Sequence, residues 1–232
     1  MDFDQIKRTY KNFGVGAVAY NFFYSAINKV TFFKVLVGMT LHPDDVAPQF
    51  FEIPPPFNGK ILSQEELEMF SQDPENDLSQ SFLQYALSKG DQCFGILDNG
   101  KLAAYGWYSN KPTRFNDTLD LHFDGSFMYM YRGWTVKAYR GKRLHAIGMA
   151  NALNHYYQAG YRGLISYVEA NNFSSLRSVY RMGYRPFGKI YVVKILNKHF
   201  LFYSGKCNEY GFSLNSREKH ISRDWGPAVT KP

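Results

Sequence analysis

Apolar positions recur at two spacings along the chain, and the spacing separates the expected helices from the expected strands. Within residues 2–29, Ile6, Tyr10 and Phe13 recur at helical spacing, which predicts an N-terminal helix. Residues 32–41 are rich in β-branched and aromatic side chains and are typical of a strand. Three consecutive prolines at 54–56 then predict irregular backbone.

Residues that cap helix ends predict two short helices next. Ser63 and Glu66 have the spacing of a capping box, and Asp77 with Gln80 repeats that spacing. Gly90 ends the second of these helices, because glycine readily adopts the left-handed conformation found just after a helix.

The rest of the chain alternates between strands and helices. Asn99-Gly100 lies between two strand-like runs, and this dipeptide is the strongest short signal of a two-residue hairpin turn. Further along, the pattern predicts strand 127–136, helix 146–159, strand 164–169, helix 173–182, strand 187–196 and strand 200–203.

Composition narrows the class of protein. The 232 residues are 45% hydrophobic and 20% charged, which excludes a mainly disordered chain and fits one domain with extensions or two small domains. Two cysteines exclude a disulfide framework. The acidic start does not resemble a signal peptide, and no run is long and apolar enough to predict a transmembrane segment. The sequence therefore predicts a soluble, cytoplasmic protein.

Charge is distributed unevenly. Residues 42–124 hold five basic and fourteen acidic side chains, whereas residues 125–208 hold thirteen basic side chains and one carboxylate, Glu169. The second segment thus carries a net charge of +12, which indicates an anionic partner. Because its basic residues are spread singly, the pattern alone does not establish binding to nucleic acid.

A basic, glycine-containing loop connects strand 127–136 to the helix after it. The loop contains Arg140, Gly141, Lys142 and Arg143, and the helical pattern begins shortly afterwards. Unpaired backbone N–H groups and the positive end of the helix dipole lie at such a position, so anions bind there. The loop is therefore the first candidate for a phosphate site.

The order of elements over residues 31–196 resembles the GCN5-related N-acetyltransferase (GNAT) superfamily. The family's pyrophosphate loop is similar to the stretch from Val136 to His145, although Arg143 and His145 stand where the family normally has small residues. The resemblance implies acetyl-CoA as acyl donor, without a metal. It implies that the cofactor is bound by Thr135, Val136, Arg140, Gly141, Lys142, Arg143, Leu144 and His145.

A second stretch, which begins at Asn172, resembles the family's Asn-x-x-Ser-Leu-Arg segment. The resemblance implies that Asn172 binds the pantetheine arm and that Ser175 lines the cofactor. Many members protonate the leaving thiolate with a tyrosine seven residues after that asparagine. Here Val179 takes that place, so Tyr180 and Tyr184 are the candidates for the acid.

Amine acylation also needs a base to remove a proton from the attacking amine. Glu169 is the candidate, because it ends a predicted strand and is the only carboxylate in the basic segment. The alternative is that Glu169 is a solvated or ion-paired residue without a catalytic role.

We therefore expect an α/β (α+β) fold with a GNAT-like, mixed but mostly antiparallel sheet flanked by helices. The predicted parts are an N-terminal helical extension at 1–30, an acetyltransferase-like domain at 31–196 and a C-terminal extension at 197–232. For the N-terminal helix, packing against the sheet is favoured over lying on a membrane.

The predicted activity is N-acetyl transfer from acetyl-CoA to a primary amine of a small or sugar-linked anionic acceptor. Two alternatives stay open: an aminoacyl or peptidyl transferase that uses charged tRNA, and an acyl-CoA-binding protein without catalysis. A homodimer also stays open.

Overall fold

The computed structural model describes residues 3–196 and 198–217. They form two compact units. The first unit contains residues 3–40 and 166–210, and the second contains residues 41–165 and 211–217. These units do not test the predicted three-part division of the chain, which stays a prediction.

The first unit is a sheet with two helices. Its strands lie in the order β10-β9-β1-β8, and β9 pairs antiparallel with both β1 and β10. Its elements are α1 (Phe3–Val30), β1 (Phe33–Leu41, the last residue of which begins the second unit), the end of β8 (Leu164–Glu169), α5 (Phe173–Met182), β9 (Arg185–Ile195) and β10 (Lys198–Gly205).

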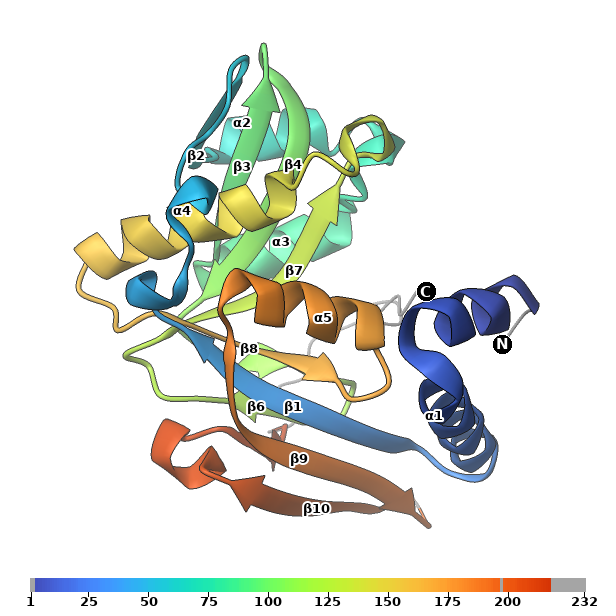
Figure 1. Cartoon of the computed structure of the whole chain (residues 1–232). Coiled ribbons are helices and arrows are strands. Elements are labelled where there is room, and N and C mark those ends of the chain that lie inside the picture. The colour runs from blue at the N-terminus through green and yellow to red at the C-terminus, as the bar shows by residue number, and fades with distance from the viewer. Residues whose placement is uncertain (1–2, 197, 218–232) are drawn as a thin grey trace. The chain divides into compact units, whose positions relative to one another are not determined.

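Helix α1 is bent, as Figure 1 shows. The break in the helical backbone lies at Gly14. Gly14 has φ 80° and ψ −179°, a conformation that glycine adopts without steric cost because it has no Cβ. After the bend, Tyr24 is buried with its ring 5.5 Å from that of Phe33, and Tyr20 lies 5.9 Å from Phe173. The second part of α1 therefore packs onto its own unit, as expected from the sequence.

The second unit contains a larger sheet. Its strands lie in the order β8-β7-β4-β3-β2, and a three-stranded sheet β11-β6-β5 belongs to the same unit. Besides the start of β8, its elements are β2 (Phe57–Ile61), α2 (Gln64–Phe70), α3 (Gln80–Lys89), β3 (Gln92–Asp98), β4 (Lys101–Ser109), β5 (Thr113–Arg114), β6 (Leu119–His122), β7 (Met128–Thr135), α4 (Leu144–Gln158) and β11 (Ser213–Ser216).

Both faces of the larger sheet are covered by helices. Helix α4 crosses one face over β3, β4 and β7, and α2 and α3 lie behind the other face (Figure 1). Trp107 is fully buried on the α2/α3 side, with its ring 5.2 Å from that of Phe82. On the α4 side, Gly148 allows a close approach, because a Cβ there would lie 3.3 Å from Ile96.

Local signals in the sequence explain several of these elements. The hairpin between β3 and β4 turns at Asn99 and Gly100, with φ of 48° and 83°, as a type I′ turn requires. The capping box of Ser63 and Glu66 is also confirmed. The start predicted at Asp77 is wrong: Asp77 closes a preceding 3₁₀ turn, and Ser79 caps α3 instead.

The predicted fold class is confirmed. The ladders that join β2, β3, β4 and β7 are antiparallel. Strands β7 and β8 pair in parallel, with Met128 opposite Leu164 and Tyr129 opposite Ile165. Within the described residues, no helix has the length and apolar character needed to cross a membrane.

Candidate functional site

The basic loop lies in the second unit, between β7 and α4. Val136 is buried and its N–H donates to the Ala103 carbonyl over 3.0 Å, which fixes the start of the loop. A 3₁₀ turn, Lys137–Tyr139, follows, and α4 begins at Leu144 rather than at the predicted position 146. The buried side chain of Leu144 belongs to the core, so only its backbone is available to a ligand at the loop.

Arg143 is the N-cap of α4 and has a left-handed backbone, with φ 61° and ψ 13°. This conformation costs a non-glycine residue about 1–2 kcal/mol, because its Cβ is crowded by the backbone, and it costs glycine almost nothing. The arginine thus adopts a backbone conformation that glycine favours. Its side chain does not cap the helix, so the first N–H groups of α4 have no side-chain acceptor from this residue.

Two further cations of the loop form cation–π contacts with aromatic rings. The Arg140 guanidinium lies 5.2 Å from the Trp134 ring centre, and Lys142 Nζ lies 5.4 Å from that of Tyr139. Tyr139 is held by a hydrogen bond of 3.0 Å to Asp98 Oδ2. Within residues 3–196 and 198–217, neither cation forms a salt bridge, so both charges remain available to an anion.

His145 packs against strand β7. A Cβ built on Gly133 would lie only 2.1 Å from Cε1 of the imidazole, so glycine is needed beneath this ring. Burial lowers the pKa of His145, and the imidazole is therefore neutral at pH 7. Whether His145 also binds the cofactor stays a prediction.

In the first unit, Asn172 is the N-cap of α5. Its Oδ1 accepts from the Ser175 N–H over 3.1 Å and from the Ser174 hydroxyl over 3.0 Å. At the other end Gly183 closes the helix in the left-handed conformation. Asn172 and Gly183 therefore set the two ends of α5. That Asn172 and Ser175 contact the pantetheine arm stays a prediction.

Glu169 ends β8 in the same unit. Lys34 Nζ lies 2.8 Å from Oε2 and 3.0 Å from Oε1, and the Tyr24 hydroxyl donates to Oε2 over 3.4 Å. That hydroxyl in turn accepts from the Val35 N–H over 3.2 Å. Burial and the nearby Glu169 charge raise the pKa of Tyr24, which stays protonated as a donor. The carboxylate is thus ion-paired, and its role as a base stays a prediction.

The two candidate acids have different surroundings. Tyr180 is 45% exposed on α5, whereas Tyr184 lies in the core after Gly183. Burial raises the pKa of Tyr184, so the phenol keeps its proton at neutral pH. That Tyr180 or Tyr184 protonates the leaving thiolate stays a prediction.

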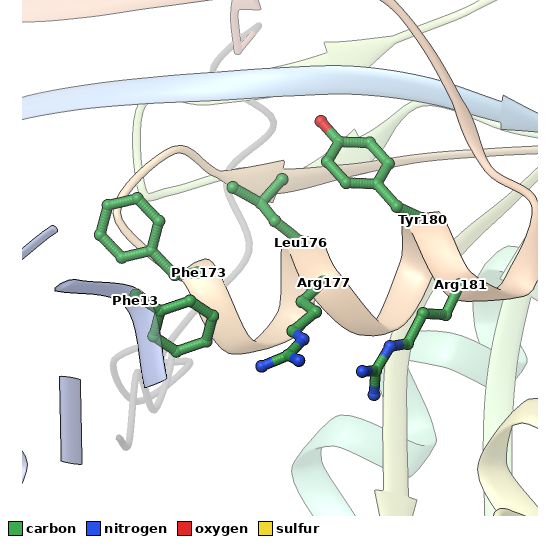
Figure 2. Close-up of a pocket in the computed structure, with 6 residues that line it drawn as sticks. All are labelled: Phe13, Phe173, Leu176, Arg177, Tyr180 and Arg181. Carbon is green, nitrogen blue, oxygen red and sulfur yellow. The ribbon is translucent and has the colours of Figure 1, made fainter. Parts of the chain in front are cut away.

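A groove runs along α5 beside the N-terminal part of α1. Phe13 and Phe173 form one end, with ring centres 5.7 Å apart, and the Arg177 guanidinium lies 5.9 Å from the Phe13 ring. The groove has a volume of about 490 Å³ and is lined by the six residues drawn in Figure 2: Phe13, Phe173, Leu176, Arg177, Tyr180 and Arg181. This groove was not predicted from the sequence. Arg177 and Arg181, four residues apart on a predicted helix, could have indicated a basic row on one helix face.

The predicted site residues fall into two groups. The loop residues, from Thr135 to His145, belong to the second unit, and the residues from Glu169 to Tyr184 belong to the first. In the described part of the chain, His, Cys, Asp and Glu side chains form no group that could hold a metal ion.

The described residues thus combine a mixed sheet flanked by helices with a cationic loop ahead of α4. Residues 59–184 match the model of the acetyltransferase (GNAT) family. Because this match spans more than half of the 232 residues, the chain belongs to that family. A search of curated proteins gives no match.

Solved structures with a similar fold include members of the same family. A GCN5-related N-acetyltransferase from Sphaerobacter thermophilus is 13% identical, with a TM-score of 0.50, over 76% of this chain and 55% of that one. A GNAT-family acetyltransferase from Colwellia psychrerythraea is 17% identical, with a TM-score of 0.50, over 73% and 60%. A Drosophila protein is 18% identical, with a TM-score of 0.45, over 78% and 58%. The matched part is less than two thirds of each of these three structures. At identities this low, the two structures with a TM-score of 0.50 show the fold alone.

Proposed function

We propose that this protein is an acyl-CoA-dependent N-acetyltransferase that transfers an acetyl group from acetyl-CoA to a primary amine. The observation that carries the proposal is the loop before α4, where Arg143 has the left-handed backbone that glycine favours. The first turn of α4 and the cations of Arg140 and Lys142 offer hydrogen-bond donors and charge of the kind that a diphosphate requires.

The proposed roles of the remaining residues follow from the reaction. The amine attacks the thioester carbonyl, a C–N bond forms, the C–S bond breaks, and CoA leaves as a thiolate that takes up a proton. Glu169 is proposed to accept the proton of the amine, and Tyr180 or Tyr184 to protonate the thiolate. Asn172 and Ser175 are proposed to bind the pantetheine arm.

The acceptor is proposed to be a small or sugar-linked molecule with a negative charge. The net charge of +12 over residues 125–208 supports an anionic acceptor. The groove along α5 adds Arg177 and Arg181 beside an apolar wall, a combination that suits an anion attached to an apolar or ring-shaped body. The proposal includes a cytoplasmic location, which the sequence predicts.

A non-catalytic acyl-CoA-binding role is the second candidate. It is favoured by the ion pair that occupies Glu169 and by Val179 at the family's usual tyrosine position. The tRNA-dependent alternative is favoured by the basic segment alone, and it predicts retention of tRNA with a steep dependence on salt.

Titration calorimetry tests the loop first. Acetyl-CoA is compared with S-acetylpantetheine, which lacks the diphosphate and the nucleotide. We expect saturable binding of acetyl-CoA and a large loss of affinity for S-acetylpantetheine, because the loop contributes only when the diphosphate is present. Equal affinities would contradict the assignment of the loop.

Thiol release in the presence of an amine panel then tests catalysis. The panel contains phosphorylated amino sugars, neutral amino sugars and polyamines. Faster CoA release with the phosphorylated sugars is expected, and a preference for polyamines would contradict an anionic acceptor. Binding of acetyl-CoA without turnover on any amine would favour the non-catalytic role.

A further inference from the structure

The second part of α1, residues 15–30, has two apolar faces. One face packs within the first unit through buried Ala17 and Tyr24. On the opposite side Val15, Phe22, Phe23 and Val30 are 71%, 51%, 58% and 89% exposed, and Ala19 and Ala26 are exposed between them. We call these six residues the outer stripe: Val15, Ala19, Phe22, Phe23, Ala26 and Val30.

The spacing of the outer stripe is that of a helix-packing surface. Val15, Ala19, Phe22 and Ala26 are separated by four, three and four residues, so they lie in one narrow row along the helix. A row of exposed apolar side chains at this spacing matches the surface that another helix covers in a helix pair.

The stripe is also symmetric about its own centre. Counting outward from the bond between Phe22 and Phe23, the next members are Ala19 and Ala26 at equal distances. Val15 and Val30 follow, again at equal distances. In an antiparallel pair of identical helices related by a twofold axis, each residue therefore meets a residue of its own type. A self-complementary patch is what a twofold interface requires.

Side-chain size fits the same arrangement. Ala19 and Ala26 leave room for two backbones to approach, and Phe22 with Phe23 fills the centre. In this register the large rings meet each other at the centre and the small alanines meet each other on either side. The antiparallel register also places Lys29 opposite Gly16 of the other copy, so the two lysines do not face each other.

Charge argues against a membrane as the partner of this stripe. Helices that lie on membranes are rich in lysine and arginine on their polar face. Residues 12–28 contain no charged side chain, and Lys29 is the only one in the segment 15–30. The segment 15–30 thus lacks the basic polar face that a membrane-surface helix has.

We propose that the outer stripe binds a second copy of this chain, and that the two α1 segments pack antiparallel about a twofold axis. A segment of sixteen residues is about 24 Å long at 1.5 Å per residue. The interface is therefore small compared with the ~1,600 Å² of a standard protein interface, and association depends on protein concentration. The proposal is independent of the proposed acetyltransferase activity.

Sedimentation equilibrium of the full chain over a wide concentration range tests the proposal. Wild type is expected to pass from monomer to dimer, and the double variant Phe22→Glu/Phe23→Glu to stay monomeric at every concentration. The matched control is Phe200→Glu/Phe202→Glu on β10, which replaces two exposed aromatic residues of the same unit and should dimerise like wild type. Unchanged thermal unfolding of both variants shows that the folds are intact.

A monomeric wild type at the highest concentration would overturn the proposal. A dimer that survives in the α1 variant, or one that the β10 variant abolishes, would also overturn it. Co-sedimentation with phosphatidylglycerol vesicles tests the alternative that the outer stripe binds a membrane. If wild type is monomeric in solution and binds vesicles through Phe22 and Phe23, the membrane is the partner instead.

Cysteine cross-linking tests the antiparallel register. A mixture of the variants Ala19→Cys and Ala26→Cys is expected to form a disulfide-linked dimer, because the two positions face each other across the axis. Each variant alone should cross-link poorly. The native cysteines, Cys93 and Cys207, are buried and give little background. Efficient cross-linking of Ala19→Cys with itself would show parallel helices and contradict the proposed pair.

Discussion

Lys34 and Glu169 form a partly buried ion pair between the start of β1 and the end of β8, with Nζ 2.8 Å from Oε2 and 3.0 Å from Oε1. The two residues are 135 positions apart in the sequence. The carboxylate proposed as the base is therefore also a structural contact of the first unit. Any variant of Glu169 changes the ion pair as well as the proposed base, and a test must separate the two effects.

Replacing Glu169 with Gln and Lys34 with Met separates the two functions. If Glu169 is the base, Glu169→Gln lowers kcat by about 100-fold or more and leaves acetyl-CoA affinity unchanged. Lys34→Met also breaks the ion pair but keeps the carboxylate, so its kcat should stay within a few-fold of wild type. Both variants are expected to lose about 1–2 kcal/mol of unfolding free energy.

Steady-state kinetics with calorimetry measures this difference, and chemical denaturation measures the stability. Equal losses of kcat in both variants would assign Glu169 a positioning role only. An unchanged kcat in Glu169→Gln, together with reduced stability, would leave the ion pair as its sole function.

The loop cations should control acetyl-CoA affinity. Arg140→Ala and Lys142→Ala are each expected to weaken binding by about 10- to 100-fold, because a charged hydrogen bond contributes roughly 1.5–3 kcal/mol. Asn172→Ala should weaken it less, since the pantetheine arm is neutral. Lys101→Ala, an exposed lysine of the same unit outside the loop, is the matched control for titration calorimetry. Wild-type affinity in both loop variants would contradict the placement of the phosphates.

The left-handed backbone of Arg143 makes a prediction about stability. Arg143→Gly should be more stable than Arg143→Ala by about 1 kcal/mol, since alanine keeps the strained φ of 61° and glycine relieves it. Both variants lose the same charge, so they should lose acetyl-CoA affinity by similar factors. Thermal unfolding measures the first effect and calorimetry the second. Equal stability of the two variants would show that the loop relaxes when the arginine is removed.

The sequence predicted elements well where local signals agree. Helix α5 has its predicted bounds, because Asn172 caps its start and Gly183 closes its end. The start of α3 was placed wrongly, since Asp77 and Ser79 are both good caps and the choice depends on the 3₁₀ turn before them.

The surroundings of the site residues were much less predictable. The partner of Glu169 is Lys34, and no local pattern connects residues on separate strands. The groove along α5 depends on Phe13 meeting Phe173, a contact that only the bend in α1 and the packing of the unit define. Spacing along the chain reports local structure, whereas these contacts depend on tertiary packing.

Burial of His145 predicts a dependence of stability on pH. Its pKa is lowered in the folded state from an ordinary value of 6.5, so the unfolded chain binds a proton more readily. The contribution of neutral His145 is complete above pH 6.5 and is lost progressively as the pH falls below it. Wild type should therefore lose more stability between pH 7 and pH 5 than His145→Gln does. His155→Gln, an exposed histidine on the same helix, should behave like wild type.

Gly133 and His145 should show strong energetic coupling. A methyl group at position 133 meets the imidazole at 2.1 Å, so Gly133→Ala must displace the ring or the strand and is expected to cost about 1–3 kcal/mol. His145→Ala removes the nearest obstacle and leaves Met130 Cε, the end of a flexible side chain, 2.9 Å from the added methyl group. In that background Gly133→Ala should therefore cost less. A double-mutant cycle by denaturant unfolding measures the coupling, expected to be about 1–2 kcal/mol in favour of the double variant. Additive losses would show that His145 does not lie over Gly133 in solution.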